Sequence, residues 1–158
     1  MKVSVICVGK LKEKFYAEAV GEYKKRISRF AELEIIELPD ERIPDNASDA
    51  EIHSVKRREG ERILAKIKPQ SYVISLCVEG KLLSSEELAE NMSRACMHAS
   101  HIVFIIGGSL GLSDEVKAAS ALCLSFGRMT LPHMLMRVVL AEQIYRAFMI
   151  NSGAAYHK

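Results

Sequence analysis

The sequence predicts an α/β domain built on a mainly parallel sheet that is covered by helices on both faces. Five short apolar runs alternate along the chain with five stretches of helical periodicity. The apolar runs are continuous, which is typical of parallel strands buried on both faces. With 158 residues, the chain suits a single domain spanning residues 1–158. The connection rules for such folds predict an ordinary open sheet without a knot.

The predicted strands are rich in β-branched residues and are each five to seven residues long. The run that begins at Ile102 is the most apolar of them. Segments that contain glycine, proline or charged residues separate the strands from the helices that follow. The five strands are expected at residues 3–8, 33–38, 72–78, 102–106 and 121–126.

The first two predicted helices have distinct sequence signals. Residues 12–28 have apolar side chains at steps of four, which form one stripe of a helix. Residues 48–67 begin with an S-x-x-E capping pattern, formed by Ser48 and Glu51, and end before Pro69. Each helix therefore has one face to bury against the sheet.

The later helices alternate with glycine-containing loops. A serine cap begins a helix at 84–99. The glycine-rich loop 107–112 follows the fourth strand and leads into a short helix at 113–119. A second short loop, 125–132, ends at a proline that starts the last helix, 132–151.

Ligands bind parallel sheets at the carboxyl ends of the strands, so the loops after the third, fourth and fifth strands are the candidate site. The first turn, Gly9 to Lys12, has neither G-x-G-x-x-G nor a P-loop, which disfavours those nucleotide sites. Glycines at 107, 108 and 111 instead follow the fourth strand, where a backbone without β-carbons can approach a ligand closely. The alternative is a tight strand-to-helix turn. With the loop after the fifth strand, the glycines would form a pocket whose backbone groups suit a purine edge.

Composition excludes several classes of protein. With 49% hydrophobic and 27% charged residues, the chain is neither disordered nor collagen-like. No apolar run approaches the ~20 residues of a membrane span, and the apolar N-terminus is too short for a signal peptide. We therefore expect a cytoplasmic location and no membrane partner. Cys96, His98 and His101 lack a fourth ligand at suitable spacing, so we expect no metal.

Charge is unevenly distributed although the formal net charge is only +2. Residues 10–29 contain seven basic and three acidic side chains, and residues 56–68 contain six and two, so each segment has a net charge of +4. Residues 31–51 have a net charge of −7. Two explanations of the basic runs are open. Each run is a helix face exposed to solvent, or the runs lie together and form a surface that binds phosphates.

The last predicted helix is apolar over more than one stripe. We expect it to be buried on two sides, against its own sheet and against a second subunit. His133 and Arg137 are four residues apart and share a face of the helix. There they would bind an anion, lie exposed to solvent or take part in an interface. Glu142 and Arg146 have the same spacing and favour an ion pair. The tail beyond Asn151 either frays or presents an aromatic ring and an imidazole to an RNA base.

Four segments of the C-terminal half have distinctive sequences: FIIGGSLG at 104–111, LSFGRMTLPH at 124–133, RVVLAEQIYRAF at 137–148 and YHK at 156–158. They closely resemble one family, the bacterial large-subunit rRNA pseudouridine N3-methyltransferases (RlmH) of the SPOUT superfamily. The turn at 9–12 and residues 67–70 also match. The resemblance covers essentially the whole chain and is most specific in its C-terminal third.

The resemblance implies a deep trefoil knot in the C-terminal part, a homodimer whose interface includes the knot, and S-adenosylmethionine as cofactor without a metal. Two positions depart from the family pattern: Gly127, where a serine-like residue is expected, and Leu131, where an aromatic residue is frequent. The implied cofactor contacts lie in the three loops that the strand-end rule selects. They are Leu76, Gly107, Phe126, Gly127, Arg128, Met129, Thr130 and Leu131.

The implied substrate is the pseudouridine at position 1915 of 23S rRNA, in a stem-loop on the decoding side of assembled ribosomes. The enzyme must align the base nitrogen with the methyl group and remove its proton. The candidates near the target base are Arg137, Glu142, Tyr156 and His157. His157 is a candidate base because imidazole titrates near neutrality, and Tyr156 would stack. One subunit's tail would complete the other subunit's site.

Two other functions remain open. One is a flavodoxin-like or other nucleotide-binding module, which the position of the glycines disfavours; a colourless protein would exclude a tightly held flavin. The other is a cofactor-binding protein that binds ribosomal RNA without catalysis, which the two intact cofactor loops disfavour.

Overall fold

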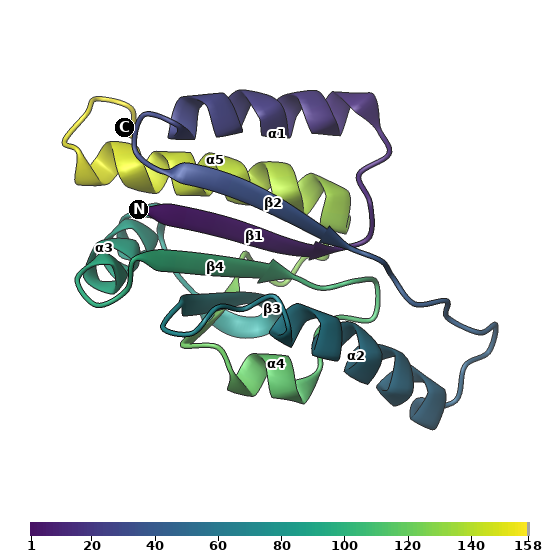
Figure 1. The fold of residues 1–158 in the computed structure, drawn as a ribbon. Helices are drawn as coiled ribbons and strands as arrows, with labels where there is room; N and C mark the ends of the chain where they lie inside the picture. The colour runs from purple at the N-terminus through teal and green to yellow at the C-terminus, as the bar shows by residue number, and fades with distance from the viewer. Residues whose placement is uncertain (158) are drawn as a thin grey trace.

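The computed structural model describes residues 1–157 and contains one five-stranded sheet in the order β2-β1-β4-β3-β5 (Figure 1). Every neighbouring pair of strands is parallel, as the continuous apolar runs predict. The carboxyl ends of all five strands therefore meet at one edge. The strands are β1 (Lys2–Val8), β2 (Glu32–Leu38), β3 (Tyr72–Leu82), β4 (His101–Ile106) and β5 (Leu122–Ser125).

Helices cover both faces of the sheet, as predicted. On one face α1, α3 and α5 bury apolar residues against the strands, and on the other face α2 and α4 do so (Figure 1). The helix α5 lies between α1 and α3 and packs against both of them. The helices are α1 (Lys14–Ile27), α2 (Asp49–Leu64), α3 (Ser85–Cys96), α4 (Asp114–Ala118) and α5 (His133–Asn151).

The predicted starts of α2 and α3 match the observed N-caps. Ser48 begins α2 with a complete capping box to Glu51, and Ser84 begins α3 in the same way with Glu87. The predicted C-terminal ends were too long, because α2 ends at Leu64 and α3 at Cys96. Residues 65–67 continue from α2 in a turn rather than in the α-helix.

The third strand is longer than predicted, because it continues past residue 78 to Leu82. Its pairing with β5 shifts register between Leu76 and Lys81. Gly80 makes the close approach possible: a β-carbon built there would lie 2.6 Å from the carbonyl oxygen of Cys123. The end of β3 is therefore wrapped tightly against the short edge strand.

The helix α5 is not covered on all sides. Leu140, Ile144 and Ala147 are fully buried against the sheet. Other apolar side chains of the helix, among them Val138 and Met149, are only half-buried. Glu142, Gln143 and Arg146 are half-buried as well, so the outer surface of the helix combines apolar side chains with a group of polar ones. Across residues 1–157, no helix combines the length and the apolar character needed to cross a membrane.

Candidate active site

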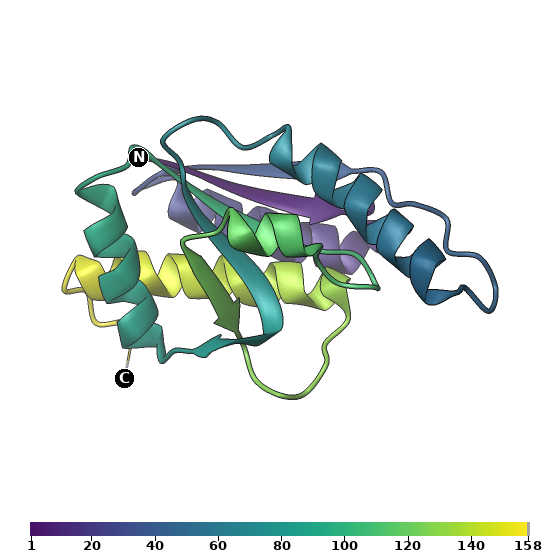
Figure 2. The ribbon, with the colours of Figure 1, turned by 90° about the horizontal axis from the view of Figure 1, so that it is seen from below.

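A cavity of about 790 Å³ opens at the carboxyl ends of β3, β4 and β5. Three segments form most of its walls: residues 76–79 of β3, the glycine-rich loop after β4, and the loop from β5 to α5, which bows away from the sheet (Figure 2). This is the edge at which parallel sheets bind their ligands. Its volume lies within the range of small-molecule and cofactor sites.

Seven of the eight predicted cofactor residues line this one cavity. The exception is Arg128, which is exposed and is not among the lining residues. The structure thus brings together three loops that are distant in the sequence. The seven residues are Leu76, Gly107, Phe126, Gly127, Met129, Thr130 and Leu131.

Glycine is required in the loop after β4 because the backbone is packed against itself. A β-carbon on Gly107 would lie 2.9 Å from the Leu112 side chain and 3.0 Å from the backbone of Gly111. Gly111 itself has a φ of +83°, which L-residues rarely adopt. Across the cavity, Gly127 has a φ of +132° and open space beside its α-carbon. The absence of a serine-like side chain at Gly127 therefore leaves room in the cavity wall.

Charged groups at the cavity were not anticipated from the sequence. Lys117 and Glu79 form an ion pair there, and Lys56 and His133 also line the wall. The hydrogen bond from Lys117 lowers the pKa of Glu79, and the same bond raises the pKa of Lys117. No local pattern predicts this pair, because its partners are 38 positions apart and Glu79 lies in a part of β3 that was expected to be a loop. The cavity therefore combines apolar walls with one region of paired charge.

Arg137 lies outside this cavity, in the buried space beneath the end of β1. Its guanidinium pairs with Glu37 at 2.8 Å and donates to the carbonyls of Gly9 at 2.7 Å and Val8 at 3.3 Å. Its side chain is 1% exposed. His133 lines the cavity, so the two residues do not form one anion site, although they share a helix face.

The other three predicted catalytic candidates gather around Arg146. Glu142 accepts hydrogen bonds from the Arg146 guanidinium at 2.7 and 3.0 Å and from the Tyr156 hydroxyl at 3.3 Å. The predicted Glu142–Arg146 ion pair is therefore confirmed. The His157 ring lies 3.1 Å from Arg146 and 2.6 Å from Glu86. Lys158 lies outside the described residues.

We call Glu142, Arg146, Tyr156 and His157 the tail cluster. Two pKa values in and beside it are shifted. Burial, followed by the nearby Glu142 carboxylate, raises the pKa of Tyr156. A backbone N–H bond, followed by the bond to His157, lowers the pKa of Glu86 to about 2. The guanidinium of Arg146 lies 4.8 Å from the centre of the Tyr156 ring. The tail is thus folded back onto α5 rather than frayed.

A smaller cavity of about 230 Å³ lies next to the large one, and Leu124 and Phe126 line both. Gln143 lines the smaller cavity and donates to Glu142 at 2.6 Å. Ser85 in turn donates to Gln143 at 2.7 Å. A polar chain therefore connects the tail cluster to the lining of the smaller cavity.

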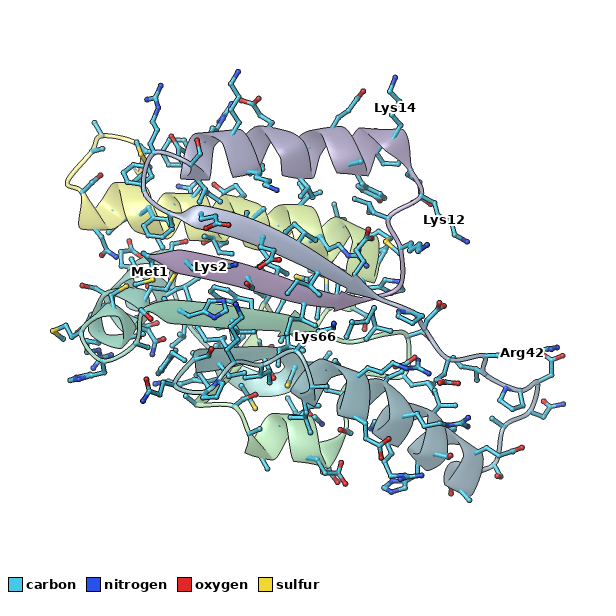
Figure 3. The ribbon with its side chains drawn as sticks, viewed as in Figure 1. Met1, Lys2, Lys12, Lys14, Arg42 and Lys66 are labelled. Carbon is cyan, nitrogen blue, oxygen red and sulfur yellow. The ribbon has the colours of Figure 1, made fainter. Side chains whose placement is uncertain are left out.

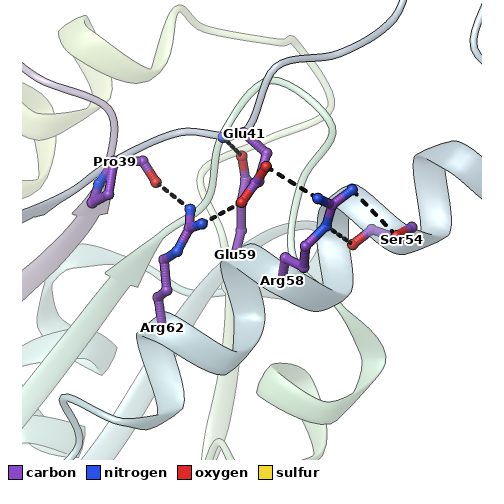
Figure 4. A network of polar contacts seen from close by, with 6 residues as sticks. All are labelled: Pro39, Glu41, Ser54, Arg58, Glu59 and Arg62. Carbon is purple, nitrogen blue, oxygen red and sulfur yellow. Dashed lines mark hydrogen bonds and ion pairs between the residues drawn. The ribbon is translucent and has the colours of Figure 1, made fainter.

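A polar network joins α2 to the loop after β2 (Figure 4), and one of its members, Glu59, lies beside Gly108 of the glycine-rich loop. Arg62 donates to the carbonyl of Pro39 at 3.0 Å and pairs with Glu41, which ties the loop after β2 to the helix. The backbone N–H of Glu41 donates to Glu59 at 3.0 Å. A β-carbon built on Gly108 would lie 3.1 Å from the other carboxylate oxygen of Glu59. Burial raises the pKa of this carboxyl.

Comparison with known proteins identifies the fold family. Residues 1–157 match the family described as "Predicted SPOUT methyltransferase". The chain belongs to the SPOUT methyltransferase family. Membership implies that the C-terminal part of this methyltransferase forms a trefoil knot. The open sheet expected from connection rules is therefore wrong in this respect, because those rules describe how rare knots are and not which sequences form them.

Relatives of this methyltransferase match over their whole length. A protein of Lactobacillus delbrueckii subsp. bulgaricus is 53% identical over 159 residues, and one of Lactococcus lactis subsp. cremoris is 56% identical over 159 residues. Both matches cover 100% of each chain, and both relatives are named "Ribosomal RNA large subunit methyltransferase H". A solved structure of the SpoU methyltransferase AviRb from Streptomyces viridochromogenes, in complex with the cofactor AdoMet, has a TM-score of 0.44 and 10% identity. That match covers 92% of this chain and 57% of AviRb, a likeness too weak to support an argument.

Proposed function

We propose that this methyltransferase methylates N3 of pseudouridine 1915 in 23S rRNA, acts on the assembled ribosome, and works as a homodimer in the cytoplasm. One observation supports the proposal most strongly. Seven predicted cofactor residues line one cavity in a chain that is 53–56% identical, over its full length, to proteins named large-subunit rRNA methyltransferases.

The methyl donor is S-adenosylmethionine, the cofactor of this methyltransferase family. The cavity suits it in size and chemistry. Leu76, Phe126 and Leu131 give apolar walls for an adenine ring, and the Glu79–Lys117 pair offers partners for an amino and a carboxylate group. When bound, the cofactor supplies a methyl group already activated by its positive sulfur.

The residues of the chain must then position the target base and take up its proton. His157 is our candidate for the base, with Glu142 as an alternative acceptor, and Tyr156 is our candidate to stack on the uracil ring. Arg146 connects all three, because it bonds to Glu142 and His157 and lies over the Tyr156 ring. Arg137, which bonds to the backbone of β1, would act through the structure around it.

We further propose that the active site is shared between two subunits. Of the four catalytic candidates, none lines the 790 Å³ cavity of its own chain. The half-buried apolar surface of α5 suits a second copy of the chain, because burying it would remove apolar area from water. In such a dimer, the tail of one subunit would complete the cofactor cavity of the other.

Mixing two inactive variants tests this arrangement. Gly107→Val blocks the cavity but keeps the tail, whereas a chain without residues 156–158 keeps the cavity but lacks the tail. Each variant alone is expected to fold, to dimerise and to be inactive on ribosomes. After co-refolding in equal amounts, half of the dimers are mixed and each has one intact shared site, so about a quarter of the wild-type activity returns.

Two results of this experiment would contradict the proposed arrangement. If mixed dimers form but no activity returns, the shared site is wrong. If the chain without residues 156–158 is fully active alone, the tail has no part in the reaction. Cofactor binding by the wild type without methyl transfer to any ribosomal substrate would instead favour the non-catalytic RNA-binding alternative.

A further inference from the structure

The loop between β1 and α1, residues 9–13, is unusually well fixed for a surface turn. The N–H of Gly9 donates to the carbonyl of Leu38 at 2.7 Å, and the N–H of Leu11 donates to a carboxylate oxygen of Glu37 at 2.5 Å. Gly9 has a φ of +90°, a conformation that favours glycine. The neighbouring strand β2 therefore holds the loop from one side.

Arg137 holds the same loop from below. One nitrogen of its guanidinium donates to the carbonyls of Val8 and Gly9, and another pairs with the carboxylate oxygen of Glu37 that binds Leu11. A charged guanidinium with several acceptors is a rigid support. Three elements, β1, β2 and α5, are thus joined at the base of this loop.

The loop presents two free cations. Lys10 and Lys12 are exposed, and among residues 1–157 neither has an acidic partner within ion-pair distance. Lys14, at the start of α1, differs because it pairs with Glu18 at 3.6 Å. Lys12 extends away from the body of the protein at the carboxyl edge of the sheet (Figure 3).

The loop lies next to the rim of the cofactor cavity. A β-carbon built on Gly9 would lie 3.7 Å from the end of the Met134 side chain and 4.0 Å from His133 Nε2. His133 lines the cavity. Lys56, at the cavity wall, and Arg128, in the loop before α5, add two cations from other elements at this edge, also without an ion-pair partner among the described residues.

We infer that Lys10 and Lys12 bind backbone phosphates of the RNA next to the target base, and that Glu37 and Arg137 are positioning residues that hold these lysines in place. The inference rests on the proposed function and specifies how its substrate is held. A rigid loop suits this role, because ordering a mobile loop on binding would cost affinity. Phosphates are favoured as ligands because two exposed, unpaired ammonium groups recognise charge without reading a sequence.

The test compares two double variants that lose the same charge. Lys10→Gln/Lys12→Gln removes the loop cations, and Lys24→Gln/Lys25→Gln removes two exposed lysines from the opposite end of α1. Ribosome binding is measured by co-sedimentation over a range of salt concentrations, with methyl transfer and calorimetric binding of S-adenosylmethionine in parallel. The loop variant should bind ribosomes about tenfold more weakly, and its salt slope should fall by about 1.4–1.8. Its cofactor affinity should be unchanged, and the control should bind within about twofold of the wild type.

Equal losses in the two double variants would overturn the inference, because they would reflect net charge alone. No loss in the loop variant would overturn it as well. So would weaker ribosome binding with unchanged binding to an isolated rRNA fragment, because the partner would then be a ribosomal protein. The wild-type methyl-transfer signal tests the proposed function separately, since binding of the variants can be compared even if no methyl group is transferred.

Glu37→Ala tests the positioning role. Unlike the lysine variants, it removes a negative charge instead of positive ones. This change removes a negative charge beside the basic loop, so charge alone would strengthen binding to ribosomes. Loss of the support predicts weaker binding, by about threefold to tenfold, with a salt slope close to that of the wild type. Stronger binding would show that Glu37 does not position the lysines. Thermal unfolding of the same sample establishes that the variant is folded.

Discussion

Arg137 on α5 and Glu37 on β2 are joined at 2.8 Å across the end of β1, and each also binds the backbone of the turn that follows β1. The guanidinium is buried, whereas the carboxylate is about one-third exposed. This relationship explains how an arginine can be fully buried on α5. It also gives Arg137 a structural role that its sequence neighbourhood did not reveal.

Replacement of Arg137 should therefore cost stability. Arg137→Met leaves two carbonyl oxygens and one carboxylate without their charged donor, so we expect a loss of about 2–4 kcal/mol. Arg137→Lys keeps the charge but cannot reach all three acceptors, and should lose about half as much. Urea unfolding measures both values. A change below about 0.5 kcal/mol in Arg137→Met would contradict the role of the pair.

Gly107→Ala should weaken cofactor binding without unfolding the protein. The added β-carbon meets the backbone of Gly111 at 3.0 Å, so the loop must move into the cavity or away from it. We expect at least a tenfold loss of S-adenosylmethionine affinity by calorimetry. Gly21→Ala is the matched control, because a β-carbon there meets nothing within 4 Å. Equal S-adenosylmethionine affinities in the two variants would show that the cofactor does not bind beside Gly107.

Alanine substitutions at two helical glycines should change the free energy of unfolding in opposite directions. Gly21 lies in α1 with open space beside it, so Gly21→Ala should stabilise the protein by about 0.5–1 kcal/mol. Gly60 lies in α2 where it packs on α4, and its β-carbon would lie 3.2 Å from the Ser113 β-carbon and 3.3 Å from Val116. Gly60→Ala should therefore cost about 1–3 kcal/mol. Denaturant unfolding of both variants is the measurement, and stabilisation by both would contradict the close packing of α2 on α4.

Glu59 predicts a pH dependence that can be isolated with one variant. Burial raises the pKa of its carboxyl above the ordinary value of 4.5, so the unfolded chain loses this proton at lower pH than the folded chain does. The contribution of Glu59 to the free energy of unfolding is therefore largest below pH 4.5, and it is lost as the pH rises through the raised pKa.

Glu59→Gln removes this titration but can still accept the bond from the N–H of Glu41. The free energy of unfolding of the variant minus that of the wild type should increase as the pH rises through the ordinary value of 4.5, and it should level off above the raised pKa. Urea unfolding at a series of pH values gives this difference. A constant difference would show that burial does not perturb the carboxyl.

Much of this architecture follows from local sequence patterns. Continuous apolar runs predict buried parallel strands, and Ser48 with Glu51 marks a helix start that the structure reproduces. The strand-end rule selects the loops after β4 and β5, which line the cavity, although on the third side the lining residues belong to β3 itself. These features depend on neighbouring residues or on general properties of parallel sheets.

Other features depend on contacts between distant segments and have no local signal. The Glu79–Lys117 pair joins residues 38 positions apart, and the Arg137–Glu37 pair joins residues 100 positions apart. The extension of β3 to Leu82 depends on Gly80 passing close to β5, which only the register of the folded sheet defines. The knot was expected only through family resemblance, since periodicity describes elements and not the path of the chain between them.

The decisive measurement is methyl transfer from labelled S-adenosylmethionine to intact ribosomes and, in parallel, to naked large-subunit RNA. An enzyme that recognises the assembled ribosome should place label in 23S rRNA at pseudouridine 1915 when ribosomes are the substrate, and little or none in naked RNA. Absence of label from both substrates, with calorimetry still detecting the cofactor in the cavity, would contradict the proposed function.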